Sequence, residues 1–140
     1  MQLKTIISRS DIGKYYKNAQ HRLDFKHQNP IEDIYEKIQK NYHIALIFDE
    51  SGNEIIGAIV CKIDNDFFSK KLCSIIDFYG LDGDSYLTIA NLLIDWIMQI
   101  SQQYLCQKIV FESFTKNKNE QKFFSSKKFI LEKFMFVKDL

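Results

Sequence analysis

The chain has 140 residues, of which 46% are hydrophobic and 14% aromatic, enough apolar material for one packed core. Its 19 basic and 18 acidic residues give a net charge of +1, so we expect no general attraction to nucleic acid or to an anionic membrane. We find neither an apolar run of about 18 residues, as a membrane-spanning helix needs, nor the apolar core of a signal peptide. We therefore expect a single cytoplasmic domain over residues 1–140.

The first third of the chain predicts a strand followed by two helices. The run Leu3–Ser8 is rich in β-branched residues, and Ser10 is a candidate N-cap for a helix that extends to about Phe25. A second helix is expected to begin at Pro30, because proline is favoured at the first helical position and Asn29 can cap it.

A β-hairpin is predicted next. The apolar runs His43–Asp49 and Glu54–Ile63 are separated by the sequence ESGN, whose residues favour turns. The second run is apolar at both alternating sets of positions, so its strand should be covered on both faces and lie centrally in an α/β sheet.

The second half alternates strands with helices. The strands are expected at Leu72–Tyr79, Lys108–Phe114 and Ile130–Asp139, with the longest helix at Ser85–Tyr104 and a shorter helix within Thr115–Phe129. This order favours an α/β fold with a mixed sheet of about six strands and helices on both faces. The strands on either side of the long helix should be parallel, because the helix provides a right-handed crossover connection.

The turn before the long helix contains Asp82 and Asp84, where a phosphate site would favour bare backbone and positive charge. Asp84 is a strong N-cap candidate whose carboxylate would accept from the amides of Tyr86 or Leu87. It would then compete with a phosphate for the same donors.

Cysteine and histidine offer no metal site. The three cysteines, Cys61, Cys73 and Cys106, have no C-x-x-C spacing, and we expect reduced thiols in the core of an intracellular protein. The three histidines are scattered without metal-ligand spacing, so no metal is expected. The P-loop, G-x-S-x-G and H-E-x-x-H motifs are also absent, which removes the signatures of several nucleotide-dependent and hydrolytic enzymes.

The segment after the strand at Lys108–Phe114 falls in register with a spaced pattern, N-x-x-A-x-x-F-Y-x-x-x-G-F, and matches three of its six defined positions. Its six defined positions are occupied here by Asn117, Glu120, Phe123, Phe124, Lys128 and Phe129, so the asparagine and the first and last phenylalanines match. With the order of elements along nearly the whole chain, this pattern resembles the GNAT superfamily of N-acyltransferases. The resemblance implies that Asn117 contacts the cofactor, while Phe124 stands where family members often have the tyrosine that protonates the departing thiolate.

The resemblance also implies an acyl-coenzyme A, either acetyl-CoA or another acyl-CoA, as cosubstrate. Its pantetheine arm would lie along the backbone near Phe78 and Tyr79, beside Phe124, and its phosphates at the start of the long helix. That start comprises Ser85, Tyr86, Leu87 and Thr88, and it lacks the basic residue and glycines of the family motif. Nearby lysines, among them Lys122, offer either a rim that attracts phosphate or an ordinary solvated surface.

Candidate catalytic groups lie on the two strands that, by the resemblance, separate to admit the acyl chain. An acyl transfer to an amine needs a base for the amine and a group that stabilises the oxyanion. Asp77 or Glu112 could be the base, and Tyr79 or Tyr86 the acid, although each carboxylate could instead have a structural role.

Two hypotheses follow. The first is an acyl-CoA-dependent N-acyltransferase that acts on a small-molecule or protein amine. The second is a GNAT-like binding or regulatory module that has lost acyl-CoA binding. They differ in whether the gap between the strands at Phe78 and Phe111 is open, or is filled by Tyr79, Tyr86 and Phe124.

Overall fold

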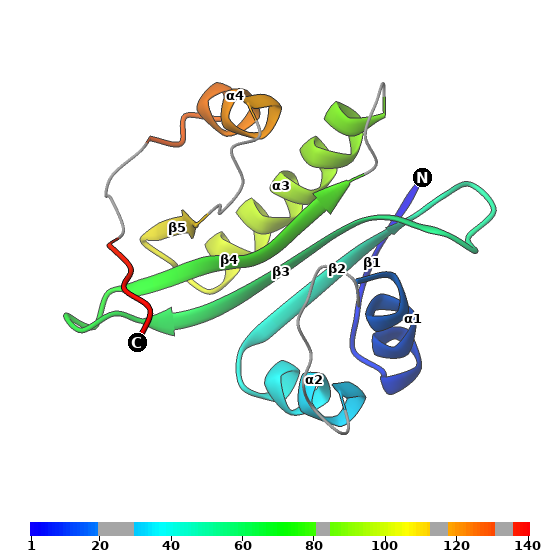
Figure 1. Cartoon of the computed structure of the whole chain (residues 1–140), viewed down its shortest axis with the longest axis horizontal. Coiled ribbons are helices and arrows are strands. Elements are labelled where there is room, and N and C mark those ends of the chain that lie inside the picture. Colours follow the sequence, from blue (N-terminus) through cyan, green and yellow to red (C-terminus); the bar gives the residue numbers. More distant parts are fainter. Residues whose placement is uncertain (20–29, 81–84, 113–117, 131–135) are drawn as a thin grey trace.

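The structure, a computed structural model, describes residues 1–19, 30–80, 85–112, 118–130 and 136–140. The elements within these residues confirm the α/β class and follow one another along the chain (Figure 1): β1 (Gln2–Thr5), α1 (Arg9–Ala19), α2 (Pro30–Gln39), β2 (Tyr42–Phe48), β3 (Ile55–Asn65), β4 (Lys71–Gly80), α3 (Tyr86–Gln103), β5 (Lys108–Phe111) and α4 (Lys118–Ser126).

The strands form one sheet in the order β1-β2-β3-β4-β5. All neighbouring pairs are antiparallel except β4 and β5, which are parallel and are connected through α3, as the sequence predicts. β5 is shorter than predicted, since it ends at Phe111 and leaves Glu112 outside the strand.

The described sheet has five strands, against about six predicted. The sixth strand is expected at Ile130–Asp139, whose residues 131–135 lie outside the described part of the chain. Ile130 and residues 136–140 belong to no strand.

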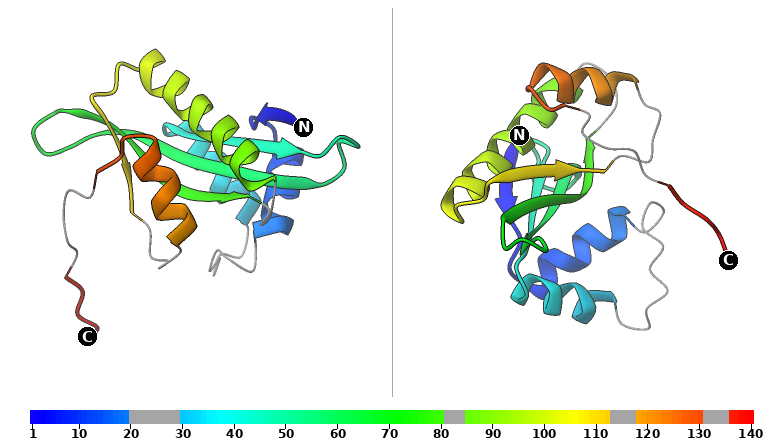
Figure 2. Two further views of the ribbon diagram at one scale, coloured as in Figure 1. Left: turned by 90° about the horizontal axis from the view of Figure 1, so that it is seen from above. Right: turned by 90° about the vertical axis from the view of Figure 1, so that its left-hand side faces the viewer.

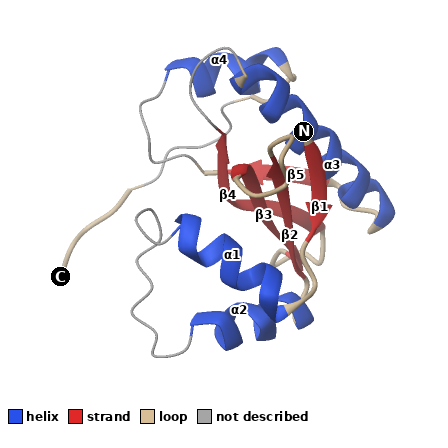
Figure 3. Ribbon diagram, turned by 90° about the vertical axis from the view of Figure 1, so that its right-hand side faces the viewer, coloured by secondary structure: helices blue, strands red, loops and turns tan. Residues whose placement is uncertain are grey.

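Helices cover both faces of the sheet, with α1 and α2 on one side and α3 and α4 on the other (Figures 2 and 3). Two groups of buried side chains correspond to these two layers. One unites the sheet with α3 and α4 and includes Ile59, Leu93 and Phe123, and the other unites it with α1 and α2 and includes Ile12 and Ile34. β3 contributes to both groups, which confirms the prediction that it is covered on both faces.

A β-bulge in β4 determines which side chains face which layer. Val60 of β3 pairs with Asp77, but the next residue of β3, Cys61, pairs with Ile75. Ile76 is therefore an extra residue, and it is 54% exposed. The bulge shifts the alternation of β4 by one position, so that Phe78 faces the α3 side and Asp77 faces the α1 side.

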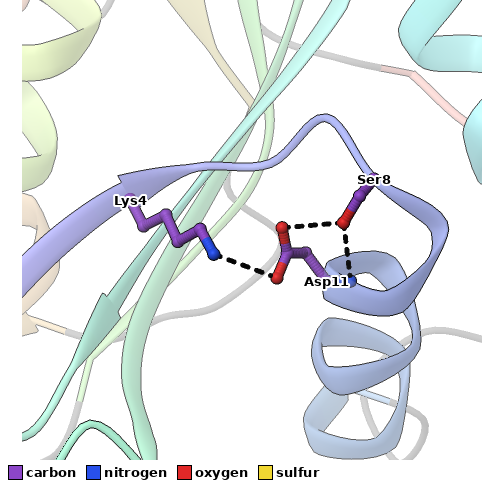
Figure 4. A network of polar contacts seen from close by, with 3 residues as sticks. All are labelled: Lys4, Ser8 and Asp11. Atoms are coloured by element: carbon purple, nitrogen blue, oxygen red, sulfur yellow. Dashed lines mark hydrogen bonds and ion pairs between the residues drawn. The ribbon is translucent and has the colours of Figure 1, made fainter.

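The start of α1 differs from the sequence prediction by the identity of its cap. The backbone N–H of Asp11 donates to Ser8 Oγ at 3.2 Å, and the Ser8 hydroxyl donates to Asp11 Oδ2 at 2.9 Å (Figure 4). Lys4 Nζ lies 3.3 Å from the other oxygen of Asp11. Ser8 is thus the N-cap, and Ser10, the predicted cap, is already inside the helix.

Two glycines bring α3 close to the sheet. Gly57 and Gly80 are paired across β3 and β4, and a Cβ on either would meet Ile89 Cγ2 of α3, at 2.5 Å from Gly57 and 2.9 Å from Gly80. Any side chain there would push the first turns of α3 away from the end of β4. The glycines therefore fix the position of the helix start relative to the strand.

Candidate functional site

The site is centred on the point where β4 and β5 part. The last paired residues of the two strands are Ile75 and Phe111, directly before the bulge at Ile76. β4 continues to Gly80 and keeps its pairing with β3. Among the described strands, β5 pairs with β4 only as far as Ile75, so the parallel pairing ends in the middle of β4.

On the α1 side of this fork, β4 presents Asp77 and Tyr79. Both follow the bulge on the same face, opposite Val60 and Ala58 of β3. The hydroxyl of Tyr15, which is 2% exposed in α1, donates to Asp77 Oδ2 at 2.7 Å. Tyr15 thus fixes the orientation of the carboxylate, and the sequence analysis did not find this residue, because 62 positions separate it from Asp77.

On the α3 side, aromatic rings fill the fork. The rings of Phe78 and Phe111 lie 6.0 Å apart, and Phe124 of α4 contacts both, at 5.3 Å from Phe78 and 4.6 Å from Phe111. Phe123 stacks on Phe78 at 6.3 Å. Of the three residues expected to fill a closed gap, Phe124 does so, whereas Tyr79 lies on the opposite face of β4.

The start of α3 lies at the end of β4, beside α4. The N-cap position is Ser85, whose side chain makes no capping hydrogen bond, and not Asp84, which lies outside the described residues. The first turn of α3 contains no acidic residue. The first amides of a helix have no partner within the helix and attract anions, so this turn is suited to a phosphate.

The α4 helix brings positive charge to the same region. Tyr86, the first residue of α3, packs against Phe123 of α4 with ring centroids 6.3 Å apart. Lys122 of α4 and Lys127, directly after the helix, are exposed, and Lys127 Nζ lies 5.8 Å from the ring centroid of Phe123. The region that borders the α3 start therefore presents exposed lysines, together with the acidic Glu120 in the first turn of α4.

The remaining predicted site residues are more dispersed. Leu87 and Thr88 are exposed in the first turn of α3. Glu112 is exposed directly after β5, at the outer side of the fork. Asn117 lies outside the described residues.

Cys61 and Cys73 are buried in the layer under α3, as predicted for core thiols. The hydrogen bond with Cys73, together with burial, raises the pKa of the Cys61 thiol. Within the described residues there is no group of three histidine, cysteine or acidic side chains that could hold a metal ion. None of the described helices is long and apolar enough to cross a membrane.

Solved structures of several acetyltransferases are similar to this chain over nearly its whole length. An acetyltransferase of Trypanosoma brucei matches with a TM-score of 0.78 at 16% identity, covering 99% of each chain. Glucosamine-6-phosphate N-acetyltransferase from Arabidopsis thaliana matches with a TM-score of 0.74 at 15% identity, again over 99% of each chain. AAC(6')-Iy, in complex with the bisubstrate analogue CoA-S-monomethyl-acetylneamine, matches with a TM-score of 0.79 at 14% identity, over 100% of this chain and 99% of that one.

No protein-family model matches the sequence, and no curated protein matches it. The structural likeness shows the fold: the chain has the fold of the GNAT acetyltransferases, as the resemblance in its sequence predicts.

Proposed function

We propose that this protein is an acyl-CoA-dependent N-acyltransferase that transfers an acyl group, such as acetyl, to an amine. The observation that carries the proposal is the fork between β4 and β5, where the parallel pairing ends at Ile75 and Phe111, beside the bulge at Ile76. The similarity to an acetyltransferase solved with a CoA bisubstrate analogue supports the choice of cosubstrate.

The acyl-CoA would extend from the edge of β4 to the first turn of α3. Its pantetheine arm is an extended chain of amides, and it can pair with the backbone of β4 at Phe78 and Tyr79 as a short added strand would. The amides of the first turn of α3 would bind the phosphates, assisted by Lys122 of α4. Asn117 would contact the arm, as the resemblance to the family implies.

The amine would approach Asp77 from the α1 side. Most amines are protonated near pH 7, so a base must remove a proton before the nitrogen attacks the thioester carbonyl. Asp77 is suited to this role because the Tyr15 hydroxyl holds one carboxylate oxygen at 2.7 Å and so fixes the orientation of the other. A backbone N–H of β4 beside the bulge would stabilise the developing oxyanion.

The departing thiolate needs a proton donor, and Phe124 cannot supply one. Tyr79 and Tyr86 are two hydroxyl-bearing residues close to the fork: Tyr79 follows Phe78 in β4, and Tyr86 packs against Phe123, the neighbour of Phe124. Either would replace the tyrosine that family members often have at the position of Phe124.

The aromatic cluster of Phe78, Phe111 and Phe124 favours a second candidate function, a binding or regulatory module without catalysis. Its rings occupy the α3 side of the fork, and Phe78 and Phe124 are nearly fully buried. An acyl chain would have to displace the ring of Phe124 or lie on the Asp77 side of the strand.

Calorimetric titration with acetyl-CoA, followed by turnover with a panel of amines, tests the proposal. We expect binding by the wild type and by Asp77→Asn, with turnover lowered about 100-fold or more in the variant, because a general base contributes on the order of 10²–10⁴. Tyr15→Phe should keep cofactor affinity and lower turnover less, since it removes only the group that orients Asp77.

Two results would contradict the proposed function or the role of Asp77. Absence of heat with millimolar acetyl-CoA at low salt would reject the enzyme and favour the non-catalytic module. Binding with unchanged turnover in Asp77→Asn would reject Asp77 as the base and leave Glu112 as the candidate.

A further inference from the structure

The hairpin between β3 and β4 ends in two exposed aromatic side chains. Phe67 is 93% exposed and Phe68 is 79% exposed, and their rings meet edge to face with centroids 5.3 Å apart. In the view from above in Figure 2, this hairpin projects beyond the helices at the left. Two phenylalanines in water at a projecting tip are costly to hydrate, so the tip is suited to contact with an apolar phase.

The turn holds both rings outward. Asp66 Oδ1 accepts hydrogen bonds from the backbone N–H groups of Phe68, at 2.8 Å, and Lys70, at 2.9 Å. The backbone closes the turn with bonds from Asp66 N to Lys70 O, at 2.8 Å, and from Ser69 N to Asp66 O, at 3.0 Å. Ser69 has a positive φ of 62°. Four hydrogen bonds thus fix the backbone of the turn that carries the two exposed phenylalanines.

Positive charge surrounds the base of the tip. Lys70 and Lys71 follow the turn, and Lys108 lies on the neighbouring strand, next to Leu72. Among the described acidic residues of this hairpin, Asp64 is paired with Lys62 at 3.0 Å, and Asp66 binds the turn amides. The excess of lysines over acidic residues is local to this end, since the net charge of the whole chain is only +1.

The α3–β5 connection adds one more apolar side chain. Leu105 is 82% exposed, and the connection is tied to the hairpin by a hydrogen bond from Gln107 N to Lys71 O at 2.8 Å. The tip, its lysines and this leucine belong to the end of β4 that is remote from Gly80 and the α3 start.

We infer that this end of the molecule binds reversibly to the surface of an anionic lipid bilayer, with Phe67 and Phe68 inserted among the headgroups and the lysines above them. Two phenylalanine side chains bury about 150–250 Å² each, less in total than the roughly 800 Å² per partner of a stable protein interface. A bilayer interface, by contrast, accepts a narrow apolar wedge, and its anionic lipids attract nearby lysines. Binding there would leave the fork on the opposite end of β4 accessible.

Co-sedimentation of the full chain with large vesicles tests this inference. We expect binding to vesicles with about one-third phosphatidylserine, weak binding to pure phosphatidylcholine, and loss of binding as salt is raised, since exposed charges are screened over about 8 Å at physiological ionic strength. Phe67→Ser combined with Phe68→Ser should reduce the partition coefficient at least tenfold. Lys70→Glu combined with Lys71→Glu should reduce it similarly.

The charge-matched control is Lys122→Glu combined with Lys127→Glu, which makes the same change in net charge in α4 and directly after it. Because the effect is local, this control should bind vesicles much more strongly than the hairpin charge variant. A direct readout of insertion is Phe67→Trp, whose emission should shift to the blue with anionic vesicles, against a constant background from Trp96, which is 7% exposed.

Three results would overturn the inference. One is absence of wild-type binding to anionic vesicles at low salt. Another is equal loss of binding in the hairpin and α4 charge variants, which would indicate a diffuse charge effect. The third is self-association that depends on Phe67 and Phe68 without vesicle binding, which would identify the tip as a protein contact. None of these readouts depends on acyl-CoA, so they remain informative even if the proposed enzymatic function fails.

Discussion

Two glycines of this fold differ in whether their surroundings leave room for a side chain. At Gly57, a Cβ would lie 2.5 Å from Ile89 Cγ2 and 3.3 Å from the carbonyl oxygen of Tyr79. At Gly13, inside α1, a Cβ would meet only Ile31 Cδ1, at an ordinary 3.7 Å. The first glycine is required by packing, whereas the second only weakens its helix.

We therefore predict opposite signs for two identical substitutions. Gly57→Ala should lower the free energy of unfolding by about 1–3 kcal/mol, because the methyl group overpacks the contact between α3 and the sheet. Gly13→Ala should raise it by about 0.5–1 kcal/mol, because alanine is favoured in a helix interior. Urea unfolding of both variants provides the measurement, and a stable Gly57→Ala would mean that α3 lies farther from β3 than described.

The sequence contains a signal for the close packing at Gly57, which lies inside an apolar run. A glycine inside an apolar strand often marks the close approach of another backbone or a bulge. The contact between Tyr15 and Asp77 had no comparable signal, because their meeting depends on how α1 crosses the sheet. The shift at Ile76 was also not predictable, since the alternating pattern of the sequence does not reveal an extra residue in one strand.

At the scale of elements, local sequence patterns determine where the helices α1 and α2 begin. The start of α2 at Pro30 was predicted correctly, because proline fixes the backbone of the first helical residue. The start of α1 was predicted at Ser10 although the pattern Ser8-x-x-Asp11 is itself a capping signature. Both Ser8 and Ser10 could be the N-cap of α1, but only Ser8 has an acidic residue, Asp11, three positions later.

The α1 cap leads to the second prediction. Ser8→Ala should lower the free energy of unfolding by about 1 kcal/mol, because the Asp11 amide loses its acceptor. Ser10→Ala is the matched control and should cause no comparable loss. The reverse order of the two effects in chemical denaturation would show that the helix begins at Ser10.

The same network gives this cap a pH dependence. Burial by itself would raise the pKa of Asp11, but the hydrogen bond from Ser8 and the hydrogen bond and charge of Lys4 lower it below its ordinary value. Because the pKa is lower in the folded state, the contribution is complete above the unfolded value of about 3.9 and is lost as pH falls through the folded pKa. The stability difference between wild type and Asp11→Asn should therefore shrink on acidification below about pH 4.

At the scale of the whole molecule, the sheet separates two environments. The fork of β4 and β5 has Asp77 and Tyr15 on the α1 side, and the α3 start with the α4 lysines on the other. The order of elements was enough to predict the parallel pair and the crossover that create this fork. The aromatic filling was predictable only in part, because ring contacts depend on the final positions of α4 and the bulge.

The whole-molecule arrangement leads to a prediction about how acyl-CoA is held. If the phosphates bind at the α3 start with help from α4, affinity should decrease steeply with added salt, because exposed charges are screened over about 8 Å at physiological ionic strength. Lys122→Ala should weaken binding severalfold at low salt and flatten the salt dependence, since one of the screened charges is gone. Calorimetric titration at several salt concentrations measures both effects.

Two variants distinguish this charge effect from other causes. Asn117→Ala should weaken binding without changing the salt dependence, because an amide carries no charge. Lys17→Ala removes an exposed lysine from α1, on the opposite layer, and should leave both affinity and salt dependence close to wild type. If Lys17→Ala and Lys122→Ala behaved alike, the lysines of α4 would act only through the net charge of the protein, and the phosphates would have to be held by the helix start alone.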